Sequence, residues 1–397
     1  MEPMGYFYLL VTLGMFALGD ILAVLTKARL SSVFVALLLF TFGFLSGLFP
    51  KDIIALANMS QVAKWATAFI VFHMGTMVNI RELVREWRTV ALSVLAMITT
   101  IAAILVCIPF VGKESAIVSI PVMKGGLVAT QVITTAAMAR GMQVAAAFAA
   151  LVYAIHKFVG TPIASFYGLK EAEIIVKKYR EDQSAAALAD AKKQTTVASK
   201  AQKKQFYERL GLEKYFTEYT CLGVTALFAW VSILLNEATG LNYSIWSLLL
   251  GATLSYFELV PPKILDRAKT SGFLSMATFA SIIPAMAGIH LQDIGIMAYQ
   301  MTVLFGATLI STFLFFYILP LWKIVGSKNL AIGITMANMI GFPANWLVVN
   351  EIANAVGTNE KEKDIIMKTI MPAYIIAGFA TVTTLSIVIA GVCEKFL

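Results

Sequence analysis

Long apolar segments alternate with short polar stretches along almost the whole chain. Ten of the apolar runs are about 20 residues long, the length that a helix needs to cross about 30 Å of hydrocarbon. They lie at residues 6–25, 31–49, 63–79, 89–109, 143–165, 217–236, 243–260, 272–290, 297–321 and 366–391. The pattern therefore predicts an all-α polytopic membrane protein with ten transmembrane helices.

One long stretch breaks this pattern in the middle of the chain. Residues 168–216 are charged and alanine-rich, which is typical of a water-exposed, partly helical linker. We therefore divide the chain into an N-terminal half at residues 1–167, a linker at residues 168–216 and a C-terminal half at residues 217–397.

Composition and charge indicate that the chain lies in a membrane and predict which side its loops face. Hydrophobic residues make up 59% of it and charged residues only 14%, a balance that excludes a soluble domain. Most of the 31 lysines and arginines fall in the linker and in loops that ten crossings place on the linker's side. Because basic loops stay in the cytoplasm, this bias predicts a cytoplasmic linker and both termini outside.

Two further apolar segments, at residues 114–141 and 328–357, are each interrupted midway by glycine or proline. Each arm is about 10 to 14 residues long, which as a helix spans about half a bilayer. An arm of that length has to turn back before it reaches the far side. We therefore expect a re-entrant hairpin in each half of the chain.

The two halves also match in order. Pro109 and Pro320 end the fourth crossing of each half, Gly126 and Gly341 lie at the two breaks, and the stretches YAIHKF and YIIAGF follow. Five crossings per half is an odd number, so a duplicated half would have the opposite orientation in the membrane. The sequence thus predicts two inverted five-helix repeats with paired broken segments, an arrangement that points to a secondary transporter.

The turns of the hairpins are the predicted binding site. Backbone groups at a turn lose their helical partners and must be satisfied by protein, water or ligand. Glycine admits a ligand to the backbone, the start of a second arm suits a carboxylate, and the carbonyls that end a first arm suit Na⁺. The predicted substrate-binding residues are Lys124, Gly125, Gly126, Thr130, Gln131, His156, Gly341, Phe342, Pro343 and Asn345. The predicted Na⁺-binding residues are Thr134, Thr135, Asn338, Asn345 and Asn350.

Alternatives stay open for three of these residues. Thr130 and Asn345 could be N-caps alone. Lys124 would cost about 2.5 to 3.5 kcal/mol in the middle of a membrane unless it meets a partner or water. It therefore either reaches an aqueous vestibule, or balances the charge of an anionic substrate, or serves as a fixed cation in place of one coupling ion.

This layout resembles the glutamate:sodium symporters and, more distantly, the 2-hydroxycarboxylate transporters. Those families tend to carry a GGxG-type cluster at each hairpin tip, and here the tips read KGGLV and IGFP. The resemblance implies a homodimer in the inner membrane of a bacterium. It also implies Na⁺-coupled uptake of a small organic anion, such as glutamate or another amino or carboxylic acid, by an elevator-type movement.

Other classes of protein fit less well. A cation/proton antiporter of related architecture is the main alternative, but Asp20 and Asp293 fall at the ends of spans. Neither a HExxH nor a GxSxG motif occurs, so we do not expect an enzyme. No cofactor besides Na⁺ as coupling ion is expected, and the expected partners are the substrate, the bilayer and a second copy of the chain, with no nucleic acid.

Overall fold

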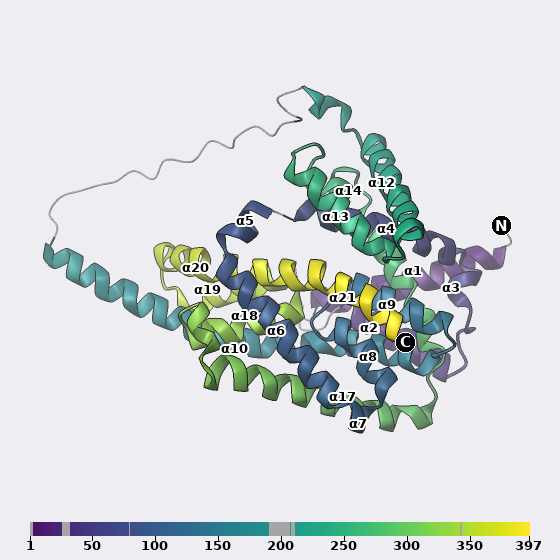
Figure 1. The fold of residues 1–397 in the computed structure, drawn as a ribbon, viewed down its shortest axis with the longest axis horizontal. Helices are drawn as coiled ribbons and strands as arrows, with labels where there is room; N and C mark the ends of the chain where they lie inside the picture. The colour runs from purple at the N-terminus through teal and green to yellow at the C-terminus, as the bar shows by residue number, and fades with distance from the viewer. Residues whose placement is uncertain (1–2, 26–31, 79, 190–206, 208–210, 342–343) are drawn as a thin grey trace.

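A computed structural model gives the structure of the chain and describes residues 3–25, 32–78, 80–189, 207, 211–341 and 344–397. Every regular element in these ranges is a helix (Figure 1). In the first half they are α1 (Pro3–Leu25), α2 (Ser32–Leu45), α3 (Ile53–Leu56), α4 (Met59–Met77), α5 (Ile80–Arg85), α6 (Trp87–Val106), α7 (Ile108–Val111), α8 (Lys113–Met123), α9 (Leu127–Ala139) and α10 (Gln143–Ala189).

The second half follows a similar order. Its elements are η1 (Leu212–Tyr215), α12 (Glu218–Thr239), α13 (Tyr243–Tyr256), α14 (Ile264–Arg267), α15 (Ser271–Ala280), α16 (Ile283–Met286), α17 (Leu291–Phe313), η2 (Leu314–Ile318), η3 (Pro320–Ile324), α18 (Lys328–Ile340), α19 (Ala344–Val356), α20 (Glu360–Gly378), η4 (Phe379–Leu385), α21 (Ser386–Cys393) and η5 (Glu394–Phe396). Of the irregular pieces, η2 and η4 are π-helical.

Six described helical segments are long and apolar enough to cross a membrane, so the protein is a helical membrane protein. They contain α1, α6, α10, α12, α17 and the continuous run from α20 to η5, and they coincide with six of the ten predicted crossings. The other four predicted crossings correspond to less regular elements. Of these, α2 and α13 have 14 residues each, α4 is less apolar, and α15 and α16 are two separate helices.

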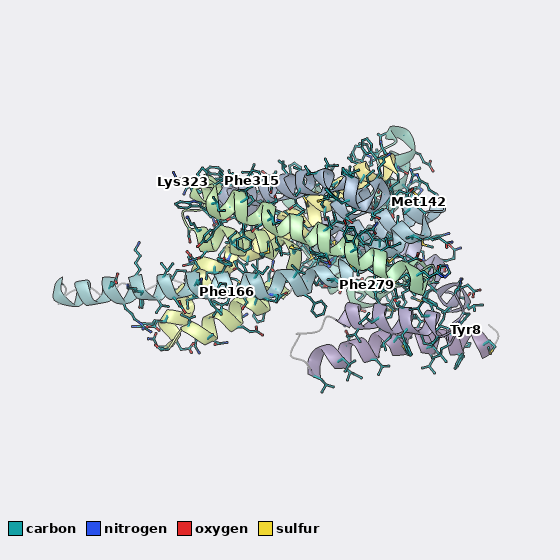
Figure 2. The ribbon with its side chains drawn as sticks, turned by 90° about the horizontal axis from the view of Figure 1, so that it is seen from below. Tyr8, Met142, Phe166, Phe279, Phe315 and Lys323 are labelled. Atoms are coloured by element: carbon teal, nitrogen blue, oxygen red, sulfur yellow. The ribbon has the colours of Figure 1, made fainter. Side chains whose placement is uncertain are left out.

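An outer group of helices consists of α1, α2, α4, α12, α13 and α15. Figure 2 shows α1 and α2 as a pair along one side of the bundle, with Tyr8 on α1. The backbones of α4 and α13 approach closely, since a Cβ on Gly75 would lie 2.5 Å from Leu248 O and one on Gly251 2.3 Å from Phe72 O. Glycine is therefore required at both positions, and it joins a helix of each half directly.

A central group consists of α8, α9, α10, α18, α19 and the run α20–η4–α21. Within it α10 and α20–η4–α21 run antiparallel. Tyr374 Oη of α20 donates to Ala164 O at 2.8 Å, and further along, Arg180 Nε and Nη2 donate to the Glu362 carboxylate at 2.8 and 2.9 Å. The predicted linker start at residue 168 lies inside α10, which continues without interruption to Ala189.

One turn occurs in both halves in the same form. After α3 the chain turns at Asn58 with φ +57°, and after α14 it turns at Lys269 with φ +54°. The backbone hydrogen bonds of residues 52–58 recur one for one at residues 263–269. A left-handed residue other than glycine is uncommon, and here one occurs in the same bonding pattern in both halves.

Candidate functional site

Two helical hairpins form the centre of the molecule. The first hairpin consists of α8 and α9, which are separated by Lys124, Gly125 and Gly126, and the second consists of α18 and α19. The first break needs glycine, because a Cβ on Gly125 would lie 1.9 Å from Pro121 O. The second break begins at Gly341, whose φ of +76° is accessible to glycine at little cost. Both breaks lie where the sequence predicted them.

The hairpins enter from opposite ends of α10, as Figure 1 shows. The first hairpin ends at Ala139, next to the start of α10 at Gln143. The second starts next to Ser327, whose hydroxyl binds the carboxylate of Glu171, far along α10. From there α18 runs back along α10, so that a Cβ on Gly160 would lie 2.9 Å from Met339 Cβ.

The two tips meet in the interior. Lys124 Nζ of the first tip donates to Thr335 O of α18 at 3.3 Å. A Cβ on Gly126 would lie 2.8 Å from Val382 Cγ1, and one on Gly341 would lie 3.1 Å from the same atom. Val382 belongs to η4, so one side chain of a π-helical segment packs against both tips. The space in front of these glycines, where we expected a ligand, is filled by Val382 in this conformation.

Lys124 is fully buried, with 0% of its surface exposed. It therefore does not reach an aqueous vestibule here. The Thr335 carbonyl is the acceptor that the described residues provide for its ammonium. Within the two hairpins, residues 115–139 and 329–350 carry no other charged side chain.

Asn345 and Asn338 tie the second tip to α20. Asn345 Nδ2 donates to Ala337 O at 3.1 Å and to Tyr374 O at 2.8 Å. With its amide oriented to satisfy its neighbours, Asn338 donates to Ala377 O at 3.1 Å and also to Ile334 O and Thr381 Oγ1. Asn345 is the second residue of α19 and its amide bonds to other helices, so it is not an N-cap.

The polar side chains of α9 bond within their own helix. Thr130 Oγ1 donates to Gly126 O at 3.0 Å and Thr134 Oγ1 to Gln131 O at 3.1 Å. Gln131 Nε2 donates to Thr135 Oγ1, and Thr135 itself is exposed. The N-cap of α9 is Gly126, so the N-cap role that we considered for Thr130 is also wrong.

Three buried polar atoms near the tips have no hydrogen-bond partner among the described residues. They are Gln131 Oε1 on α9, Asn345 Oδ1 on α19 and His156 Nδ1 on α10. Buried polar atoms are normally paired, so each requires an explanation such as a ligand or ion. All three belong to residues that the sequence predicted as substrate-binding.

The remaining predicted residues lie elsewhere. Asn350 bonds to Trp346 O in its own helix and lines an outer pocket of about 430 Å³ with Glu360 and Lys363. It is therefore away from the tips. Phe342 and Pro343 lie outside the described residues.

Three residues at the site were not predicted: Thr335, Tyr374 and Val382. Tyr374 fills a slot in which Cβ atoms on Gly168 and Gly333 would lie 2.9 and 2.2 Å from its hydroxyl oxygen. Its match to Tyr153 in the sequence repeat was the available signal. Thr335 acts through a backbone carbonyl and Val382 through its position in a π-helix, and neither property is visible in an apolar sequence.

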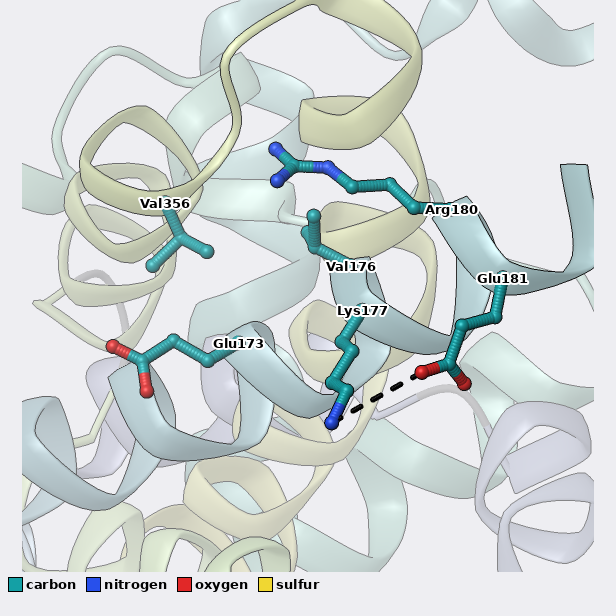
Figure 3. Close-up of a pocket in the computed structure, with 6 residues that line it drawn as sticks. All are labelled: Glu173, Val176, Lys177, Arg180, Glu181 and Val356. Carbon is teal, nitrogen blue, oxygen red and sulfur yellow. Dashed lines mark ion pairs between the residues drawn. The ribbon is translucent and has the colours of Figure 1, made fainter. Parts of the chain in front are cut away.

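Two surface pockets flank the central group. One of about 460 Å³ is lined by residues of α10 and by Val356 of α19 (Figure 3). Within it Lys177 Nζ lies 4.0 Å from Glu181 Oε1. The other, of about 450 Å³, lies beside the start of α10 and includes Lys51, Asp52 and Gln143. Neither contains a residue of the tips.

Comparisons with known proteins give no further assignment: no protein-family model and no curated protein matches the chain.

Proposed function

We propose that the protein is a secondary active transporter that takes up a small organic anion, such as glutamate or another amino or carboxylic acid, together with Na⁺. The observation that supports it most is the meeting of two broken helices that enter from opposite ends of α10. Broken helices place backbone N–H and C=O groups near the middle of a membrane, where they can bind a substrate and an ion. A purely structural bundle would have no use for two such interruptions.

The charge of the inner parts of the central group favours an anion. Residues 115–139, 141–169, 329–350 and 369–393 contain no aspartate or glutamate, whereas they contain Lys124 and Lys157. A buried cation without a carboxylate beside it attracts an anionic ligand. An antiporter for cations and protons would instead need an acidic group in this region.

Neutral oxygen atoms are available for Na⁺. The unpartnered Oδ1 of Asn345 and Oε1 of Gln131 are hard ligands of the kind that alkali cations accept. Thr134 lies on the same arm as Gln131, Asn338 lies on the other arm of the second hairpin, and both are buried. We propose these four residues, and no longer Asn350 or the exposed Thr135, as the side chains for the coupling ion.

The mechanism we propose is of the elevator type. The central group carries the tips and would move as a unit against the outer group, which would form the interface of a homodimer. The ten crossings in two inverted repeats, the cytoplasmic linker, the external termini and the bacterial inner membrane belong to the same proposal. The recurrent turns at Asn58 and Lys269 support the duplication.

Thermal stabilisation of the purified protein tests the substrate class directly. We expect L-glutamate, citrate or succinate to raise the apparent melting temperature, and to raise it more in NaCl than in choline chloride. The acid that stabilises would then be used for uptake into proteoliposomes under an inward Na⁺ gradient. No stabilisation and no uptake of any acid would contradict the proposal, and Na⁺-driven proton movement without acid uptake would indicate the antiporter.

A further inference from the structure

The position of Lys124 relative to α18 distinguishes between its two remaining roles. Carbonyls of a helix point toward its C-terminal end, and the last four lack intrahelical donors. Thr335 is not one of these four, since it lies five residues before the end of α18 at Ile340. Because its carbonyl points along the helix, the ammonium bound to Thr335 O lies on the C-terminal side of Thr335, in the second half of α18. The C-terminal end of α18 is the negative end of its dipole, and a coupling cation is expected to bind near such an end in a broken helix.

The segments of the central group around the first tip offer Lys124 no carboxylate, and Glu394 of η5, an element that also contacts α9, accepts from Asn242 Nδ2. Residues 115–139 of α8 and α9, residues 329–350 of α18 and α19, residues 369–393 of α20, η4 and α21, and residues 89–112 of α6 and α7 contain no other charged side chain. Residues 143–169 of α10 contain no aspartate or glutamate, and their basic side chains are His156 and Lys157. The charge of Lys124 is thus balanced only by carbonyl dipoles, as that of a bound metal cation would be.

We infer that Lys124 is a tethered cation that occupies the position of one coupling ion beside the C-terminal half of α18. The side chain comes from the first hairpin and its acceptor from the second, so it joins the tips as a shared ion would. An ammonium has three N–H donors, and Thr335 O takes one of them, so two remain available to the substrate of the proposed function. This inference rests on the proposed function for the substrate, but the cation position itself is testable without any substrate.

The experiment measures the response of the purified full-length protein to Na⁺ alone. Apparent melting temperatures are recorded from zero NaCl upward, with choline chloride keeping the ionic strength constant. We expect the Lys124→Ala variant to show a saturable Na⁺-specific rise that exceeds that of the wild type by about 2 °C or more, because removal of the ammonium opens the position to Na⁺. Lys124→Gln should behave in the same way.

Two variants serve as matched controls. Lys124→Arg keeps a cation at the position, and Lys157→Ala removes another lysine of the central group, whose ammonium lies over the Tyr153 ring. Both should keep the Na⁺ response of the wild type. A Lys124→Ala protein that folds in NaCl but not in choline chloride would support the inference as well.

The inference is overturned if Lys124→Ala and Lys124→Gln respond to Na⁺ as the wild type does, or if neither folds in either salt. These results are separate from those on the proposed function. Acid uptake by the wild type together with an unchanged Na⁺ response in the variants would support the proposed transport function and contradict only the inference that Lys124 is a tethered cation. An Na⁺ response in the variants without uptake of any acid would support the inference on Lys124 and contradict the proposed transport function.

Discussion

The two hairpins share a backbone design but differ in how their side chains are used. Thr130 N bonds to Gly126 O after the first break, and Asn345 N bonds to Gly341 O after the second. Beyond this, the first hairpin carries a buried charge and bonds its hydroxyls within α9, whereas residues 329–350 of the second carry no charge and two of their amides bond to α20. The comparison suggests that the first tip provides a buried positive charge, whereas the second tip is held to α20 by the hydrogen bonds of its two amides. We call these hydrogen bonds the anchor.

Removal of the charge should have the largest effect. We expect Lys124→Ala to reduce uptake of the transported acid about tenfold or more at low Na⁺, because the buried positive charge at the first tip is lost. The matched variant is Thr335→Val, which keeps the carbonyl that binds Lys124 and removes only a hydroxyl bonded to Ile332 O in its own helix. Its uptake should stay close to that of the wild type. Equal losses in the two variants would contradict a specific role for the charge.

The anchor can be tested by stability. Asn345→Ala deletes donors to Ala337 O and Tyr374 O, and the loss should lower the free energy of unfolding by about 2 kcal/mol or more. Thr130→Ala, the equivalent change in the first hairpin, should cost less than about 1 kcal/mol because its hydroxyl bonds only within α9. Denaturant titration of both variants gives the comparison, and a larger loss for Thr130→Ala would reverse the assignment of the anchor.

Glycine at the two tips is required for different reasons. Gly126→Ala brings a Cβ to 2.8 Å from Val382 Cγ1 at an ordinary φ of −108°, while Gly341→Ala meets the same atom at 3.1 Å with φ at +76°. We expect each to destabilise by about 1 to 2 kcal/mol. Addition of Val382→Ala should recover part of the loss for Gly126 only, because the backbone strain at Gly341 stays. Recovery of both, measured in double-mutant cycles, would mean that packing alone explains both glycines.

The smallest effect concerns the tyrosines that the repeat aligns. Tyr374→Phe removes the hydrogen bond to Ala164 O and should cost about 1 kcal/mol. Tyr153→Phe should cost less, since no hydrogen bond of its hydroxyl is found in the described part of the chain. Thermal unfolding of the two variants measures the difference. An equal cost would mean that the two tyrosine hydroxyls contribute equally to stability in the two halves.

Much of this site follows from the sequence because chain breaks are local. Glycine and proline within an apolar run locate both tips, and an arm of half the bilayer length implies that the chain turns back. The limits of helices were harder to predict. The apolar run at residues 243–260 continues past the end of α13 at Tyr256. The sequence did not predict this helix end, because the turn at Glu258 depends on a left-handed backbone conformation that apolar neighbours do not signal.

Long-range contacts account for the other differences. Thr130 was considered as an N-cap because it follows the glycines, but α9 begins directly at Leu127 and places Thr130 in its first turn. Asn350 lies on the same helix as Asn345 but faces an outer pocket. The contribution of Val382 depends on the π-helical geometry of η4, and nothing in the residues around it distinguishes it from the other valines.

That single valine also limits how the two tips can diverge in evolution. In an ideal duplication each tip would have its own neighbour, and mutations in one half would be accepted or rejected independently of the other. Here both Gly126 and Gly341 pack against Val382 Cγ1, so any change of volume at position 382 is exposed to selection at both tips at once. A lineage that alters the ligand space at one tip through this position must therefore accept or compensate the same change at the other.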